Sequence, residues 1–97
     1  MANKIIKSTK YCNIISQAKV DDEEYTYCIE RIFVKAKRRE EIRFSLYKDT
    51  IRSINRYIPR SLDVTELELM ELIKKAIKDK VFSKEFIEML KNEINNI

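Results

Sequence analysis

The 97-residue sequence contains no glycine, and Pro59 is its only proline. Glycine enters left-handed backbone conformations without a steric cost, so other residues must fill any left-handed turn position. We expect Asn, Asp or Lys at such positions. The absence of glycine also excludes the Gly-rich phosphate loops of P-loop and dinucleotide-binding proteins.

The first half of the chain has the pattern of β-strands. Residues 1–10 predict a leading arm or an edge strand. Residues 11–20 and 25–36 are rich in apolar and β-branched side chains, which is typical of strands. The four acids at 21–24 predict a solvated hairpin loop between these two strands.

Two strands, at 25–36 and near 41–48, are expected to have one core face and one solvent face, with a charged turn at 37–40 between them. A bulge near Glu30 would reconcile the two halves of the first strand. The predicted core side chains are Cys28, Ile32, Val34, Ala36, Ile42, Phe44 and Leu46. The predicted solvent-facing side chains are Arg31, Phe33, Lys35, Arg43, Ser45 and Tyr47.

Residues 49–60 allow two interpretations. The isoleucines are spaced as in a short helix, but the same stretch can be a loop followed by a strand that pairs with 41–48. We favour the strand, and Pro59 is expected to end either element.

The last third of the chain predicts two helices. Asp63 and Thr65 each precede a glutamate by three residues, which is the capping-box signature of a helix start. Ser83 can cap the second helix. The apolar stripes are Leu69, Leu72, Ile73, Ala76 and Ile77 in the first helix, and Phe86, Ile87, Leu90, Ile94 and Ile97 in the second.

These elements predict one α+β domain, residues 1–97, in which an antiparallel sheet of about four strands is followed by two C-terminal helices. The two helices carry more apolar surface than one small sheet face needs. We therefore expect a homo-oligomer, most simply a dimer.

Positive charge is concentrated in residues 31–60, where ten Lys and Arg against three acids give +7 in a chain of net charge +4. Residues 1–30 sum to −1 and residues 61–97 to −2. Basic residues with interleaved aromatic rings suit single-stranded nucleic acid or another polyanion, although an ordinary solvated sheet face can have the same composition. We expect the binding surface to be a basic face of the sheet. The predicted nucleic-acid-binding residues are Arg31, Phe33, Lys35, Lys37, Arg38, Arg39, Arg43, Tyr47, Arg52, Arg56 and Tyr57.

The sequence predicts neither an enzyme nor a metal or cofactor site. It contains no histidine, and its two cysteines, Cys12 and Cys28, lack CxxC spacing. We interpret them as reduced thiols, with a bridge between facing strands as the alternative. The carboxylates form no acid–base pair on either predicted element. No signal-peptide core or apolar run of membrane-spanning length is present, so we expect a cytoplasmic protein.

The runs EIRFSLYKD (41–49) and PRSLDVTELELMELIKKAI (59–77) resemble the C-terminal domain of the transcriptional coactivator positive cofactor four and its bacterial relatives. Ile42–Arg43–Phe44 is similar to the family's strand, and residues 60–64 stand where its basic segment leads into the helix. The resemblance implies a dimer whose curved sheets bind single-stranded DNA or RNA without enzymatic activity.

A second class of function is consistent with the same charge and size. The chain could be a protein-interaction or small-anion-sequestering module, for example a phage or mobile-element inhibitor of a host protein. A closed pocket between subunits would favour the small anion, and a smooth positive groove on the sheet would favour nucleic acid.

Overall fold

The computed structural model describes residues 5–49 and 56–97. The chain divides into two compact units, Met1–Glu66 and Leu67–Ile97. The first unit is an antiparallel sheet and the second holds two helices, which confirms the predicted α+β class.

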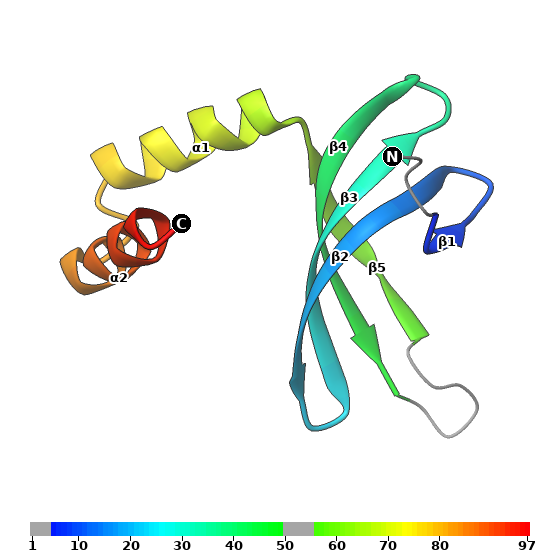
Figure 1. Ribbon diagram of the computed structural model, residues 1–97, viewed down its shortest axis with the longest axis horizontal. Helices are drawn as coiled ribbons and strands as arrows, with labels where there is room; N and C mark the ends of the chain where they lie inside the picture. The colour runs from blue at the N-terminus through cyan, green and yellow to red at the C-terminus, as the bar shows by residue number, and fades with distance from the viewer. Residues whose placement is uncertain (1–4, 50–55) are drawn as a thin grey trace. The chain divides into compact units, whose positions relative to one another are not determined.

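The sheet contains five strands among the described residues, in the order β1-β2-β3-β4-β5, so each strand pairs with its sequence neighbour (Figure 1). The strands are β1 (Lys7–Ser8), β2 (Cys12–Asp22), β3 (Tyr25–Val34), β4 (Arg39–Lys48) and β5 (Arg56–Val64). The short β1 pairs with β2 and confirms the edge strand expected near the start.

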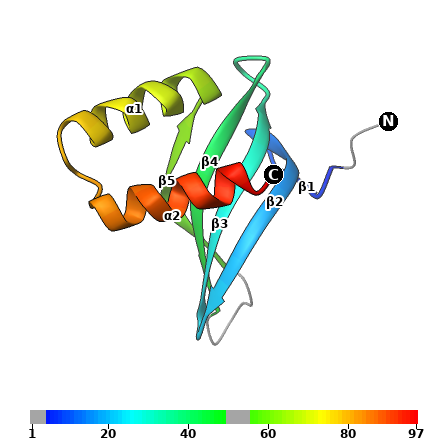
Figure 2. The same ribbon diagram turned by 60° about the vertical axis from the view of Figure 1, so that its left-hand side comes forward.

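The second unit consists of α1 (Glu66–Lys78) and α2 (Lys84–Asn95), joined by a short connection (Figure 2). Ser83 caps α2 as predicted, because its side chain accepts a hydrogen bond of 3.1 Å from the Phe86 amide. No residue of either helix is buried. Neither is long and apolar enough to cross a membrane, and no other helix occurs in the described part of the chain.

Among the described residues, three non-glycine residues adopt left-handed backbone conformations: Glu23 (φ 55°), Arg38 (φ 53°) and Lys80 (φ 59°). The first two lie in the hairpin turns on either side of β3, and Lys80 follows α1. Such a conformation costs an L-residue about 1–2 kcal/mol. The expectation of Asn, Asp or Lys is therefore right only for Lys80. In the two hairpins, the tertiary pairing of long strands imposes the turn on whichever residue is present.

β5 continues through Pro59 to Val64, so the expectation that this proline ends the element is wrong. The pairing with β4 shifts between Phe44 and Leu46, and Pro59 lies within the irregular stretch of β5 opposite that shift. Proline is tolerated in edge strands and at bulges because it has no amide hydrogen to donate there. The strand interpretation is confirmed from Arg56 onward, and residues 50–55 lie outside the described residues.

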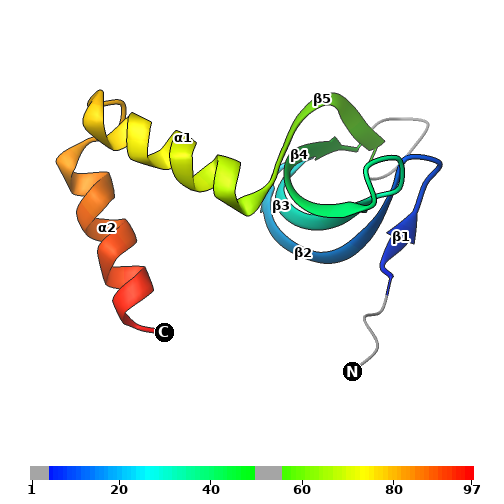
Figure 3. The same ribbon diagram turned by 90° about the horizontal axis from the view of Figure 1, so that it is seen from above.

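The sheet is strongly curled (Figure 3). All the described side chains that are buried lie on one of its faces, which we call the Glu30 face: Cys12, Ile14, Cys28, Glu30, Ile32, Glu41, Ser45 and Tyr47. Cys12, Ile14 and Ile32 form its apolar core, with Val34 packed against them. Because burial is confined to this face, it is the concave side of the curl.

The predicted core side of β3 is confirmed at Cys28, Ile32 and Val34, whereas Ala36 is exposed in the following turn. The bulge expected near Glu30 is absent from the β3–β4 pairing, and the shift occurs in β2 between Ile14 and Ser16.

The predicted faces of β4 are reversed. Cys28 lies opposite Ser45, and Ile32 lies opposite Glu41, so the odd-numbered residues of β4 share the buried face. Phe44 is 39% exposed and Tyr47 only 8%. Directly opposed residues point to the same side of a sheet, so the register with β3 overrides the local apolar pattern of β4.

Candidate nucleic-acid interface

Two turns at one end of the sheet lie side by side and together carry five exposed cations. The Lys35 amide donates to the Tyr11 carbonyl over 3.0 Å, and Lys35 Nζ donates to the Thr9 carbonyl over 2.6 Å. These bonds tie the β3–β4 turn to the β1–β2 turn. We call this region the basic tip, and its members are Lys10, Tyr11, Lys35, Lys37, Arg38 and Arg39.

One buried carboxylate organises part of the basic tip. Glu41, 2% exposed, accepts from Lys37 Nζ at 3.3 Å and from the Arg39 guanidinium at 2.8 Å. Burying a charge is costly unless an opposite charge or hydrogen bonds compensate it. The two cations that compensate Glu41 keep about half of their side-chain surface exposed. The carboxylate therefore fixes the position of two cations that still face solvent.

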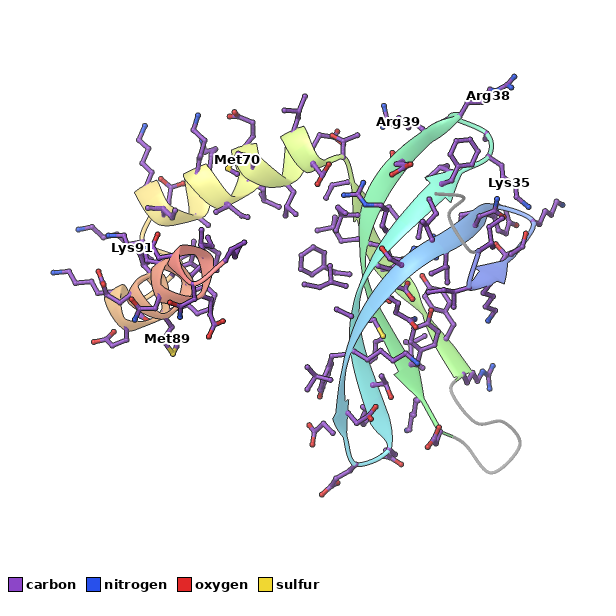
Figure 4. The ribbon with its side chains drawn as sticks, in the orientation of Figure 1. Lys35, Arg38, Arg39, Met70, Met89 and Lys91 are labelled. Carbon is purple, nitrogen blue, oxygen red and sulfur yellow. The ribbon has the colours of Figure 1, made fainter. Side chains whose placement is uncertain are left out.

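The basic tip remains positive after its acids are counted. Its five cations outnumber Glu40 and Glu41 by three. Arg38, at the left-handed position of the turn, projects from the end of the hairpin (Figure 4). The end of β2 and the β2–β3 turn, residues 21–24, hold four consecutive acids. The negative charge of the sheet is therefore concentrated in a different hairpin turn from the positive charge.

An exposed ring accompanies these charges. Tyr11 is 72% exposed, and its backbone is held by the contact with Lys35. An accessible ring beside cations is the arrangement on which an unpaired base can stack. Phe33, predicted for that role, is half-buried between its cross-strand neighbours Asn13 and Glu40.

Tyr47 cannot act as a stacking partner, because it lies on the buried face. Its hydroxyl donates to Glu30 Oε2 over 2.8 Å, and the Ser45 hydroxyl donates to Glu30 Oε1 over 2.8 Å. The Gln17 amide supplies a third donor to the same carboxylate. Burial, followed by the hydrogen bond to Glu30, raises the pKa of Tyr47 well above the ordinary tyrosine value. This cluster is a structural network inside the curled sheet.

Arg43 and Tyr57 extend that packed region toward β5. Arg43 forms a two-point ion pair with Asp63, at 2.8 and 2.9 Å, and its guanidinium lies 5.5 Å from the centre of the Tyr57 ring. The Tyr57 ring is 5.6 Å from that of Tyr47. The hydrogen bonds from Arg43 lower the pKa of Asp63. The charge of Arg43 is therefore matched within the protein.

The remaining predicted cations lie apart from the tip. Arg31 is on the opposite face of the sheet, where it bonds Glu40 and Glu66, each at 2.9 Å. Arg56 is exposed at the start of β5, opposite Lys48. Arg52 lies outside the described residues.

Of the predicted binding residues, the fold brings four together at the tip, namely Lys35, Lys37, Arg38 and Arg39. Sequence reasoning missed Lys10 and Tyr11, which lie outside the basic stretch and join it through the pairing of β2 with β3 and the bond between the Lys35 amide and the Tyr11 carbonyl. It also missed the role of Glu30. The sequence feature that could have revealed this role is a charged residue at a core-facing position of a predicted strand. Polar side chains occupy the inward positions of the neighbouring strands.

A cavity of about 220 Å³ opens on the Glu30 face. Two lysines, Lys7 and Lys19, lie in its wall. The other lining residues are Ile6, Ile14, Gln17, Thr26, Cys28 and Tyr47.

Within residues 5–49 and 56–97, no group of three or more potential metal ligands is close enough to hold an ion. Both cysteines are buried free thiols, in agreement with the reduced interpretation. No family model, curated protein or solved structure matches this chain.

Proposed function

We propose that this protein binds single-stranded nucleic acid and that the basic tip is the contact surface. The observation that carries the proposal is the meeting of five cations and one exposed ring on two adjacent turns. Lys and Arg neutralise phosphates and release their counterions, while an exposed ring accepts a base without reading its sequence. The expected binding is therefore salt-dependent and tolerant of sequence.

The basic tip suits this role better than the faces of the sheet. Arg43 and Arg31 are each matched by carboxylates of the same chain, at distances of 2.8 to 2.9 Å. A cation that must leave such a partner gives up interaction energy before it gains a phosphate. Arg38, at the end of its hairpin turn, and the exposed ring of Tyr11 require no such exchange.

The test is a titration of a labelled homopolymeric single strand at about 50 mM and about 200 mM salt, a range over which phosphate contacts weaken strongly. Arg38→Gln is expected to weaken binding and to reduce the log–log salt slope by about 0.7, the value for one phosphate of a single strand. Lys91→Gln on α2 removes the same charge outside the sheet unit and is the matched control. Absence of binding by the unaltered protein at low salt, or equal effects of the two substitutions, would reject the proposal.

The stacking role has a separate test. Tyr11→Ala is expected to lose about 1–3 kcal/mol of binding free energy, the usual value of one stacked base, without changing the salt slope. Tyr11→Phe retains the ring and is expected to bind like the unaltered protein. If the phenylalanine variant binds as weakly as the alanine variant, the ring does not stack on a base.

The cavity on the Glu30 face favours a second candidate, the small-anion module. Lys7 and Lys19 both line it, and its volume is sufficient for an anion of phosphate size. Calorimetric titration with inorganic phosphate tests this function. Lys19→Gln should abolish phosphate binding, whereas Lys48→Gln, which removes a cation outside the cavity, should leave it unchanged. No heat of binding with the unaltered protein would rule this candidate out.

A further inference from the structure

The face of the sheet opposite Glu30 presents a continuous apolar surface. Its members stand in two rows of directly paired residues, and we call it the Phe44 face: Ala18, Ile29, Phe44 and Leu62 in one row, and Val20, Tyr27, Leu46 and Ile58 in the other. None of these side chains is charged and none is buried. Phe44 is 39% exposed, Ile29 50% and Val20 66%.

The Phe44 face is hollowed. A groove of about 620 Å³ runs over it, and its wall includes Phe44, Ile29 and Val20. Contiguous exposed apolar patches on soluble proteins mark interaction sites. The eight uncharged side chains of the Phe44 face, with a groove among them, therefore indicate a covering element that is also apolar.

The helical unit carries a surface of the same chemistry. Met70 and Met89, which are labelled in Figure 4, are 55% and 59% exposed. Phe86, on the predicted stripe of α2, is 41% exposed. Both helices are amphipathic, yet neither buries a single residue. In proteins of this class, the apolar stripe of a helix is stabilised by packing against a sheet face.

We propose that the helical unit of a second copy of this chain covers the Phe44 face, and that the exchange is reciprocal. Only Thr65 separates β5 from α1. Connections between strands and helices usually span about 2–6 residues, and short hinge segments favour the exchange of an element between copies. A two-fold dimer then contains two equivalent helix-on-sheet contacts, and both apolar surfaces of each copy are covered.

This interface is independent of the proposed nucleic-acid function. None of the basic-tip residues belongs to the Phe44 face, so Arg38→Gln is expected to leave the association state unchanged. A failure of nucleic-acid binding would leave the dimer standing, and a failure of the dimer would leave the tip available to bind.

The experiment is sedimentation of the full chain at about 1–100 µM, which covers moderate to weak association. Phe44→Asp on the sheet and Leu72→Asp on α1 should each abolish both helix-on-sheet contacts of the homodimer, so each variant alone should sediment as a monomer over this range. Leu67→Asp is the matched control, because Leu67 is 82% exposed and lies off the predicted stripe of α1. Far-UV circular dichroism establishes that each variant is folded.

Mixing the two weakened variants gives the decisive result. In a mixed dimer, the helices of the Phe44→Asp copy can cover the intact sheet face of the Leu72→Asp copy, so one of the two contacts is restored. We expect the mixture to associate more tightly than either variant alone, which an unfolded variant could not achieve. A monomeric unaltered protein, a dimer insensitive to either substitution, or a mixture no tighter than its components would overturn the proposal.

Discussion

The buried hydrogen-bond network around Glu30 makes a direct prediction about stability. Tyr47→Phe removes one hydroxyl and leaves the ring in place, so Glu30 loses one of its three side-chain donors. Tyr47 is 8% exposed and Glu30 fully buried, so water cannot readily replace the missing bond. A hydrogen bond to a charged group contributes about 1.5–3 kcal/mol. In a domain of 60–100 residues, that loss lowers the midpoint of thermal unfolding by roughly 6–24 °C.

Thermal and urea unfolding followed by circular dichroism measure this change. Tyr11→Phe is the matched control, because it also removes one tyrosine hydroxyl, but from a ring that is 72% exposed and lies outside the Phe44 face. We expect no measurable loss of stability in the control, since water solvates an exposed hydroxyl. If Tyr47→Phe is as stable as Tyr11→Phe, Tyr47 faces solvent and the assignment of the buried face is wrong.

Three further predictions concern titration and reactivity. Burial, together with the hydrogen bond to Glu30, keeps Tyr47 protonated in the folded protein at a pH above 10, where the tyrosine of the unfolded chain ionises. The free energy of unfolding should therefore decrease as the pH rises above about 10. In pH-dependent urea titrations, Tyr47→Phe should lessen that decrease, and an unchanged profile would contradict the cause. Arg43 lowers the pKa of Asp63 in the folded protein. This ion pair therefore stabilises the fold at a pH above the pKa of an unfolded aspartate, and the stabilisation is lost as the pH falls through the folded pKa. Arg43→Gln should therefore flatten the loss of stability between about pH 5 and pH 3. An acid limb as steep as that of the unaltered protein would show that the pair does not contribute. Cys12 and Cys28 are 1% and 5% exposed, and burial raises the pKa of Cys28, so both thiols should react with a chromogenic disulfide only after unfolding, whereas rapid reaction of the native protein would contradict their burial.

The sequence alone predicted the type and order of the elements. The β-branched runs of the first half form strands, and the 3.6-residue periodicity after Thr65 forms helices. The N-cap at Ser83 was readable because capping joins residues three positions apart. These features depend on neighbours in the sequence, which is why they could be predicted from it. Two local rules failed. Pro59 does not end its element, because an edge strand tolerates it through an irregular pairing. The left-handed positions of the two hairpin turns hold Glu23 and Arg38, not Asn, Asp or Lys.

Which residues share a site was a matter for tertiary structure. The cations of residues 31–60 form one block in the sequence, but Glu66 and Asp63, which lie outside it, neutralise Arg31 and Arg43. Lys10, by contrast, reaches the basic tip from outside that block. Ion pairs between distant residues depend on strand order, which local composition does not encode.

The assignment of the two faces also required the whole sheet. In β4, the apolar set containing Phe44 and the polar set containing Tyr47 alternate equally well, so the strand by itself allows either to be buried. The pairing of β4 with β3 decides the matter, because Cys28 and Ile32 fix the buried side and the residues opposite them must share it. The curvature of the sheet then determines which side chains are buried. The concave side excludes water even from the carboxylates of Glu30 and Glu41, while the opposite side leaves Phe44 exposed.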